Sequence, residues 1–136
     1  MYPKEFNSDY IYAIEPNFTD SLSDIIERSG RKNHIIKMLE QRLSFLEERK
    51  HSVFEREWFE KPKKYKGIYF IHIKDENLNI RISFIFYTYE KKQYAVLLSV
   101  FTETKKSTAK TDSYGSHVPT IIPIINNMEE VFKHGL

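Results

Sequence analysis

Three basic or titratable side chains alternate along two apolar segments in the middle of the chain. His72 and Lys74 lie in the segment 68–74, and Arg81 lies in the segment 79–89. Residues two apart in a strand point to the same face, so adjacent strands would place all three side chains on one surface. Arg and Lys stabilise charge on phosphate oxygens, and His can move a proton near neutral pH. The combination is typical of a surface that meets a phosphate backbone.

The opposite face of both segments is apolar, which predicts how the sheet is oriented. Tyr69, Ile71 and Ile73 alternate with the polar positions of the first segment, and Ile80 begins the corresponding row in the second. We expect this apolar face to pack on helices and the face with His72, Lys74 and Arg81 to stay open to solvent. Tyr87 would share the open face and could stack on a base. Cross-strand packing is the commoner role of such a tyrosine.

The first half of the chain predicts a strand and a helical hairpin. Residues 10–15 alternate weakly and end at a proline, as a short strand does. Apolar residues then recur at helical spacing from Phe18, with Thr19 or Ser21 available as the N-terminal cap and Gly30 as the terminator. A second helix follows, with one apolar stripe formed by Ile35, Ile36, Leu39, Leu43 and Leu46.

The second half predicts an antiparallel meander and a last helix. Its strands are residues 68–74, 79–89 and 94–102, joined by short polar turns. The third strand is apolar on both faces, so we expect it to be central or covered on both sides. Residues 105–118 are interpreted as a polar loop, and an amphipathic helix is expected to begin near Pro123. The sequence therefore predicts a single α+β domain over residues 1–136, with a largely antiparallel sheet of three to four strands.

Composition sets the class of protein and the charge pattern. The chain has 136 residues, 40% of them hydrophobic, and no cysteine. No run of roughly 20 apolar residues and no secretory leader is present, so we expect a cytoplasmic protein with no membrane contact. Residues 49–74 carry eight Lys or Arg against three Glu, and residues 91–110 carry five Lys against one Glu. Residues 1–30 are acidic, so the positive charge is concentrated as in a polyanion-binding protein.

The order strand, helical hairpin, meander and final helix resembles the RelE/ParE toxin superfamily. The segment G-I-Y-F-I-H-I-K, followed by I-R-I-S-F-I-F and V-L-L-S-V-F-T-E-T-K-K, is similar to its HigB-like branch, which includes phage-derived relatives. Gly67-Ile68-Tyr69, Arg81 and Phe101 stand where that pattern places them, and Lys105 and Lys106 follow. The resemblance extends from about Tyr10 to Phe132.

The resemblance implies the toxin of a type II toxin–antitoxin system. Such a toxin is a metal-independent, ribosome-dependent endoribonuclease that cleaves mRNA through attack of a 2′-hydroxyl on the adjacent phosphate. Its partners would be mRNA on the ribosome and a cognate antitoxin protein, with no cofactor. The candidate catalytic residues are Arg81 and Lys74 as cations and His72, with His117 in reserve, as the proton carrier. The candidate RNA-binding residues are Lys64, Lys66, Tyr87, Lys105, Lys106 and Tyr114.

Other interpretations stay open. A single strand histidine is more often simply a surface residue, and Arg81 could be the ion-pair partner of Asp75 or Glu90. A ParE-like relative would inhibit DNA gyrase without catalysis. The chain also departs from the family pattern at Phe70 and Glu103, where acidic and basic residues are frequent. These departures leave room for an RNA- or protein-binding domain that has lost its chemistry.

Overall fold

A five-stranded sheet with helices on both faces forms the protein. The computed structural model describes residues 7–76, 78–103 and 113–135. Within this part, the elements in chain order are β1 (Ile11–Ala13), α2 (Asn17–Ser29), α3 (Lys32–Arg49), the 3-10 helix η1 (Lys50–Glu55), β2 (Phe59–Glu60), β3 (Tyr69–Asp75), β4 (Leu78–Tyr89), β5 (Lys92–Thr102), α4 (Ser113–Asn126) and α5 (Met128–Gly135).

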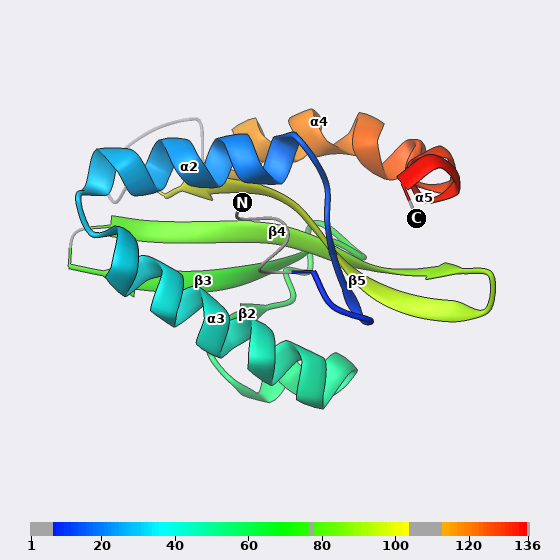
Figure 1. Cartoon of the computed structure of the whole chain (residues 1–136), viewed down its shortest axis with the longest axis horizontal. Helices are drawn as coiled ribbons and strands as arrows, with labels where there is room; N and C mark the ends of the chain where they lie inside the picture. Colours follow the sequence, from blue (N-terminus) through cyan, green and yellow to red (C-terminus); the bar gives the residue numbers. More distant parts are fainter. Residues whose placement is uncertain (1–6, 77, 104–112, 136) are drawn as a thin grey trace.

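The strand order is β1-β5-β4-β3-β2 (Figure 1). β3, β4 and β5 form an antiparallel meander, β2 adds two residues antiparallel to β3, and β1 runs parallel to β5. The predicted α+β class and the three meander strands are therefore confirmed. The sheet has one strand more than expected because β2 lies in the stretch 53–65, where charged residues and Pro62 mask any periodicity.

The helical hairpin covers one face of the sheet. Phe18, Leu22, Ile25 and Ile26 of α2 are buried in a core with Ile71, Ile73, Ile80, Ile82 and Phe84 of the strands. Gly30 ends α2 in the left-handed conformation, as predicted. The predicted caps are wrong, because α2 begins at Asn17 and Pro16 stands at its N-cap without a side-chain bond. The Ser21 hydroxyl instead accepts a hydrogen bond from the Val100 amide at 2.9 Å and joins α2 to β5.

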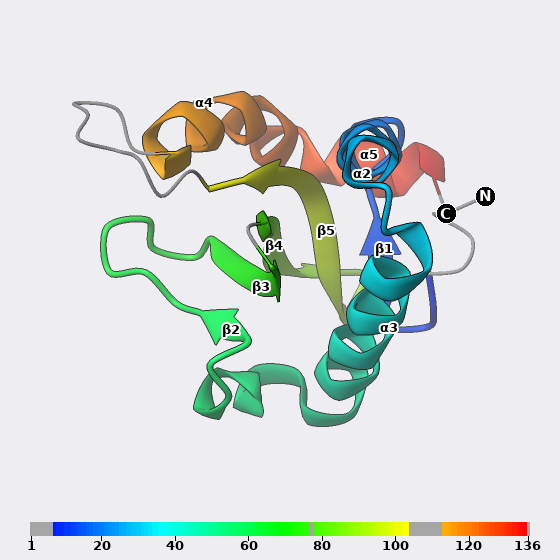
Figure 2. The ribbon, with the colours of Figure 1, turned by 90° about the vertical axis from the view of Figure 1, so that its left-hand side faces the viewer.

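The second face is also covered, so the prediction that it stays open is wrong over most of its length. α4 and α5 pack there on a second core, which contains Phe70, Ile85, Tyr94, Val96, Leu98, Val118, Ile121, Met128 and Phe132. Figure 2 shows α4 above the end of β5, with α2 and α3 to the right of the strand. The double burial predicted for the third strand is confirmed.

The stretch after β5 also differs from its prediction. Residues 113–118 form the start of α4 instead of a loop, and the helix continues through Pro119 and Pro123. Both prolines are exposed and lie four residues apart, on the side of α4 away from the sheet. Burial of Val118 and Ile121 holds the helix on the sheet, and this overrides the usual interruption by proline. None of the described helices is long and apolar enough to cross a membrane.

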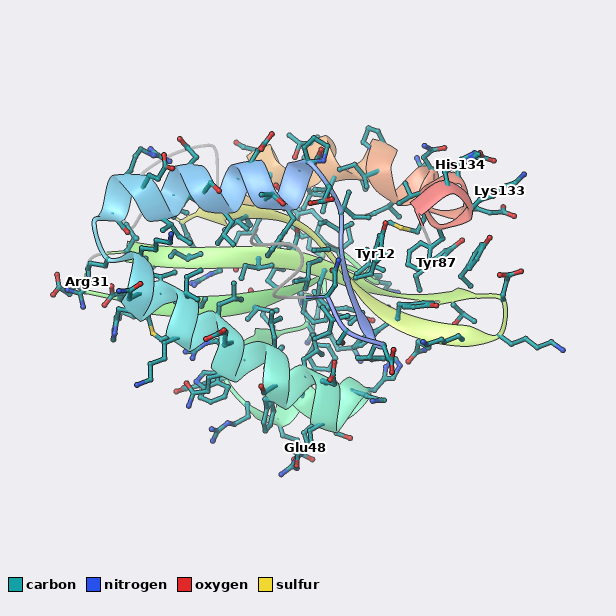
Figure 3. All side chains as sticks on the ribbon, viewed as in Figure 1. Tyr12, Arg31, Glu48, Tyr87, Lys133 and His134 are labelled. Atoms are coloured by element: carbon teal, nitrogen blue, oxygen red, sulfur yellow. The ribbon has the colours of Figure 1, made fainter. Side chains whose placement is uncertain are left out.

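Phe132 holds α5 in place, and this gives a first prediction. Its ring centroid lies 4.9 Å from that of Tyr12, 5.1 Å from that of Tyr87 and 4.8 Å from that of Tyr94. Figure 3 shows Tyr12 and Tyr87 beside α5. We expect Phe132→Ala to lower the free energy of unfolding in urea by about 3–5 kcal/mol, because it leaves a cavity. Ile122→Ala, at an exposed position, should change it by less than about 0.5 kcal/mol. Equal losses in both variants would contradict the packing described.

Candidate functional site

Four polar side chains from four elements meet at the end of the sheet that the second core leaves uncovered. Glu60 of β2 accepts hydrogen bonds from two of them through its Oε1 atom. The His72 Nε2 atom lies 2.9 Å from this oxygen, and the Tyr114 hydroxyl lies 2.5 Å from it. Arg81 Nε in turn donates to the Tyr114 hydroxyl at 3.1 Å. We call Glu60, His72, Arg81 and Tyr114 the polar cluster.

Arg81 also forms an ion pair, but with a partner that the sequence did not suggest. Its Nη2 atom lies 2.9 Å from Glu103 Oε2, and its side chain is only 13% exposed. Asp75, one of the two expected partners, is instead hydrogen bonded to Arg31. The Arg81 guanidinium thus contacts both the Glu103 carboxylate and the Tyr114 hydroxyl, and these two contacts hold it against the sheet.

The strand register positions the cluster. His72 lies directly opposite Arg81 in the β3–β4 ladder, which brings their side chains onto one face as predicted. Glu60 pairs with Phe70, one position away on the same face. The Phe70 ring packs 4.6 Å from the ring of Tyr114, between centroids, and fixes the start of α4 above the strands. Phe70 is thus a packing residue that supports the cluster.

Burial and charge set the protonation states of the cluster. Burial lowers the pKa of His72, and the neighbouring Arg81 lowers it further, against the opposing hydrogen bond to Glu60. The imidazole is therefore neutral at pH 7 and donates its Nε2 proton to the Glu60 carboxylate. Burial raises the pKa of Tyr114, and Glu60 raises it further, so the phenol stays protonated. The cluster combines a neutral base, a carboxylate, a proton donor and a fixed cation.

A cleft of about 480 Å³ opens beside the cluster. Its lining residues are Arg42, Glu57, Trp58, His72, Lys74, Asn79 and Arg81. His72, Lys74 and Arg81 were predicted to share a surface, and all three reach this cleft. Cations beside a neutral histidine can stabilise the charge that develops when a phosphodiester is attacked.

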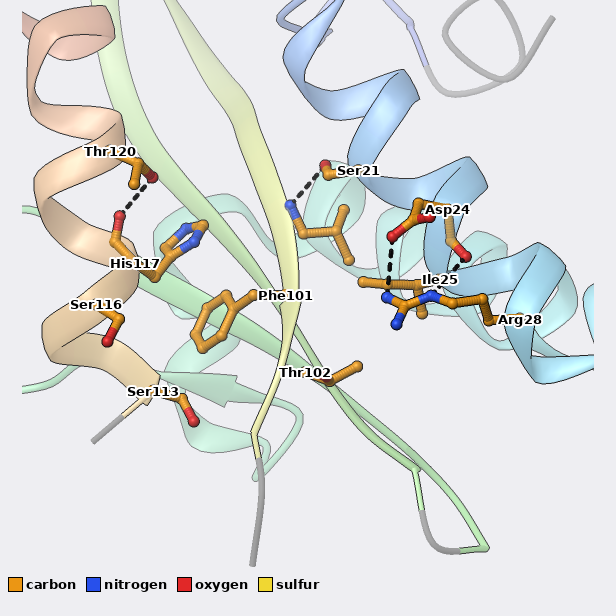
Figure 4. Close-up of a pocket in the computed structure, with 11 residues that line it drawn as sticks. Ser21, Asp24, Ile25, Arg28, Phe101, Thr102, Ser113, Ser116, His117 and Thr120 are labelled. Atoms are coloured by element: carbon orange, nitrogen blue, oxygen red, sulfur yellow. Dashed lines mark hydrogen bonds and ion pairs between the residues drawn. The ribbon is translucent and has the colours of Figure 1, made fainter. Parts of the chain in front are cut away.

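His117 lies in a different environment from the one predicted. It belongs to α4, stacks on Phe101 at 4.1 Å between ring centroids and is buried. Its Nε2 atom lies 2.9 Å from the Ser83 hydroxyl, which donates to the Ser99 carbonyl at 3.2 Å. His117 therefore borders a separate cleft of about 540 Å³ between α2 and α4 (Figure 4).

The remaining predicted residues lie away from the cluster or outside the described part. Tyr87 packs on Phe132, six residues along β4 from Arg81, which corresponds to about 20 Å. Lys64 and Lys66 are exposed in the connection between β2 and β3. Lys105 and Lys106 lie outside the described residues. Tyr114, in contrast, joins the cluster, where its hydroxyl is bonded to Glu60 and Arg81.

Sequence reasoning missed Glu60, Glu103, Arg42 and Trp58. Glu60 lies in a two-residue strand without periodicity, so nothing indicated its direction. Arg42 occupies a buried position of α3, one residue before Leu43 of the apolar stripe, and that placement was the one usable signal. The chain matches no family model, and neither the curated proteins nor the solved structures contain a match to it.

The burial of His117 predicts a loss of stability in acid. Burial lowers its pKa to about 4, whereas the unfolded chain protonates near 6.5. Between these values the unfolded state binds the extra proton, so stability is intact above pH 6.5 and falls as the pH drops toward 4. From pH 7 to about pH 4.5, the free energy of unfolding should fall by roughly 2 kcal/mol more in the wild type than in His117→Gln.

Urea unfolding at both pH values measures this difference. His134→Gln is the matched control, since His134 is exposed on α5 and bonded to Glu130 four residues earlier. It should keep the wild-type dependence on pH. If His117→Gln also kept it, the acid sensitivity would come from other groups.

Proposed function

We propose that the protein is a ribosome-dependent endoribonuclease, the toxin of a type II toxin–antitoxin system, that cleaves mRNA at the polar cluster. The observation that carries the proposal is the hydrogen-bonded set of Glu60, His72, Arg81 and Tyr114 beside a cationic cleft. The strand order and the helical hairpin agree with the fold that the resemblance to the RelE/ParE superfamily implies. On this proposal the protein acts in the cytoplasm, where its substrate is translated.

In the proposed reaction, the 2′-oxygen of one nucleotide attacks the adjacent phosphorus and the bond to the 5′-oxygen breaks. His72 takes the 2′-hydroxyl proton at Nδ1 while its Nε2–H remains hydrogen bonded to Glu60, whose carboxylate stabilises the imidazolium. Tyr114 gives a proton to the leaving 5′-oxygen. Glu60 Oε1 contacts both His72 Nε2 and the Tyr114 hydroxyl, so the imidazolium can then pass its Nε2 proton through this carboxylate to the Tyr114 phenolate.

The cations have a separate task in this scheme. Charge accumulates on the non-bridging oxygens during attack, and fixed donors next to those oxygens lower the barrier. Arg81 is held by Tyr114 and Glu103, so its guanidinium needs little reorganisation. Lys74 lies on the same face of β3 as His72 and reaches the same cleft. The products would be a 2′,3′-cyclic phosphate and a 5′-hydroxyl end.

Cleavage of mRNA on programmed ribosomes, with the new ends mapped by primer extension, tests the proposal. We expect Glu60→Gln and His72→Ala each to lower the single-turnover rate by about 10²–10⁴-fold. Arg81→Gln should lower it by about 10²–10³-fold. His134→Ala, an exposed histidine that also bonds a glutamate, should cleave like the wild type.

Far-ultraviolet circular dichroism of each variant shows whether it is folded. Wild-type protein that arrests growth without producing mapped ends would exclude the ribonuclease and favour a binding inhibitor of the gyrase type. Cleavage that survives in folded His72→Ala and Arg81→Gln would place the chemistry elsewhere.

The pH dependence of cleavage follows from the state of His72. Its neutral form is the active base, and its pKa lies below the ordinary value of about 6.5. We therefore expect the rate to hold as the pH falls to 6.5 and to decline only at more acidic pH. Single-turnover rates across that range measure the profile. A decline centred above pH 6.5 would be inconsistent with His72 as the base.

A further inference from the structure

Arg42 is a buried cation on the wall of the cleft, and the described residues offer it no counter-ion. The residue is only 8% exposed, and no carboxylate of the described chain forms an ion pair with it. Its Nε atom donates to the His72 carbonyl at 2.8 Å, and its Nη1 atom donates to Gln41 Oε1 at 3.3 Å. Charged groups are rarely buried without a pair, because the lost hydration is not recovered.

The surroundings of Arg42 hold it in position without neutralising it. Its guanidinium carbon lies 4.4 Å from the centroid of the Trp58 ring, and that of Arg56 lies 4.0 Å from the same centroid. Burial lowers the pKa of Arg42, and the neighbouring Arg56 lowers it further. An anion that entered the cleft would relieve this repulsion and supply the missing counter-charge.

The other charges of the cleft point to the same kind of ligand. Lys74 and Arg81 line it together with Arg42, and among the described lining residues only Glu57 is acidic. Arg42 is bonded to the backbone carbonyl of His72, so the site lies next to the proposed base. The planar fork of an arginine is suited to bidentate contact with phosphate oxygens.

We propose that Arg42 binds a phosphate group of the RNA chain beside the scissile linkage, in the cleft that it shares with Lys74 and Arg81. This inference rests on the proposed function, since it names a contact to the same substrate. Trp58 is a positioning residue, since its ring lies against the Arg42 guanidinium and holds it at the cleft wall.

The test measures binding without cleavage. The probe is a short fluorescein-labelled RNA with a 2′-O-methyl group on every sugar, which removes the attacking hydroxyl. Fluorescence anisotropy over a range of KCl concentrations gives the affinity and its salt dependence. Arg42→Met removes the charge and keeps most of the stem. Arg49→Met is the matched control, because Arg49 lies two helical turns along α3 beside Phe45 and does not line the cleft.

We expect Arg42→Met to weaken binding on the order of tenfold, as the loss of a charged hydrogen bond does. The slope of log affinity against log salt should become shallower by about 0.7, the value for one phosphate of a single strand. Arg49→Met should bind like the wild type, and Glu57→Gln should bind more tightly. The Tm of Arg42→Met should equal or exceed that of the wild type, because a buried unpaired charge has been removed.

Several outcomes would overturn the inference. The inference is wrong if Arg42→Met binds the probe with wild-type affinity, or if Arg42→Met and Arg49→Met lose equal affinity. It is also wrong if the wild type does not bind the probe. If Arg42→Met unfolds, the test depends on Glu57→Gln, a change at an exposed position. Unchanged or weaker binding of the probe by Glu57→Gln would contradict a phosphate in the cleft.

Cleavage on ribosomes separates this inference from the proposed function. If Arg42→Met binds the probe normally and His72→Ala abolishes cleavage, the proposed Arg42–phosphate contact is wrong and the proposed ribonuclease activity stands. If Arg42→Met binds the probe more weakly but the wild type does not cleave mRNA, the Arg42–phosphate contact stands and the proposed ribonuclease activity is wrong.

Discussion

Burial of β5 on both faces is the constraint on which the rest of the structure depends. The run Ala95–Leu98 is fully buried, with Ala95 and Leu97 in the core under α2 and α3 and Val96 and Leu98 in the core under α4 and α5. A strand that is apolar on both sides needs a layer of structure on each. The chain must therefore return over the second face after β5. That return places Tyr114 above Phe70 and within reach of Arg81, so the polar cluster is a consequence of core packing.

The polar cluster occupies the place where the second core ends. Here the side chains that face α4 change from Phe70 to His72 along β3, and from Ser83 to Arg81 along β4. Each polar group is half-buried, so it loses hydration and needs a partner. Glu60 and Tyr114 supply those partners from two other elements. Apolar residues at these positions would serve the fold as well, and this is why the polar cluster is the candidate site.

The sequence could predict what depends on local alternation. The meander strands, the helical hairpin and the common face of His72 and Arg81 all follow from spacing within short segments. α4 could not be predicted, because Pro119 and Pro123 oppose a helix locally and only contact with the sheet outweighs them. Glu60 could not be predicted either, since a strand of two residues has no period. The burial of His117 and the packing of Tyr87 depend on how α4 and α5 cover the second face of the sheet, which local spacing does not indicate, so both residues were misplaced.

The exposed lysines and the buried arginines of the chain have different physical explanations. Lys64 and Lys66, in the segment that made the chain look like a polyanion-binding protein, are exposed, and exposed lysines at the ends of strands also keep sheet edges from pairing. Arg81 and Arg42 differ, because each is buried against aromatic or backbone groups at a cost in hydration. Glu103 offsets that cost for Arg81, whereas among the described residues Arg42 contacts carbonyls, an amide and an indole ring. Arg42 is the one of the two whose charge no carboxylate among the described residues neutralises, and it therefore gives the more specific support to the proposed anionic substrate.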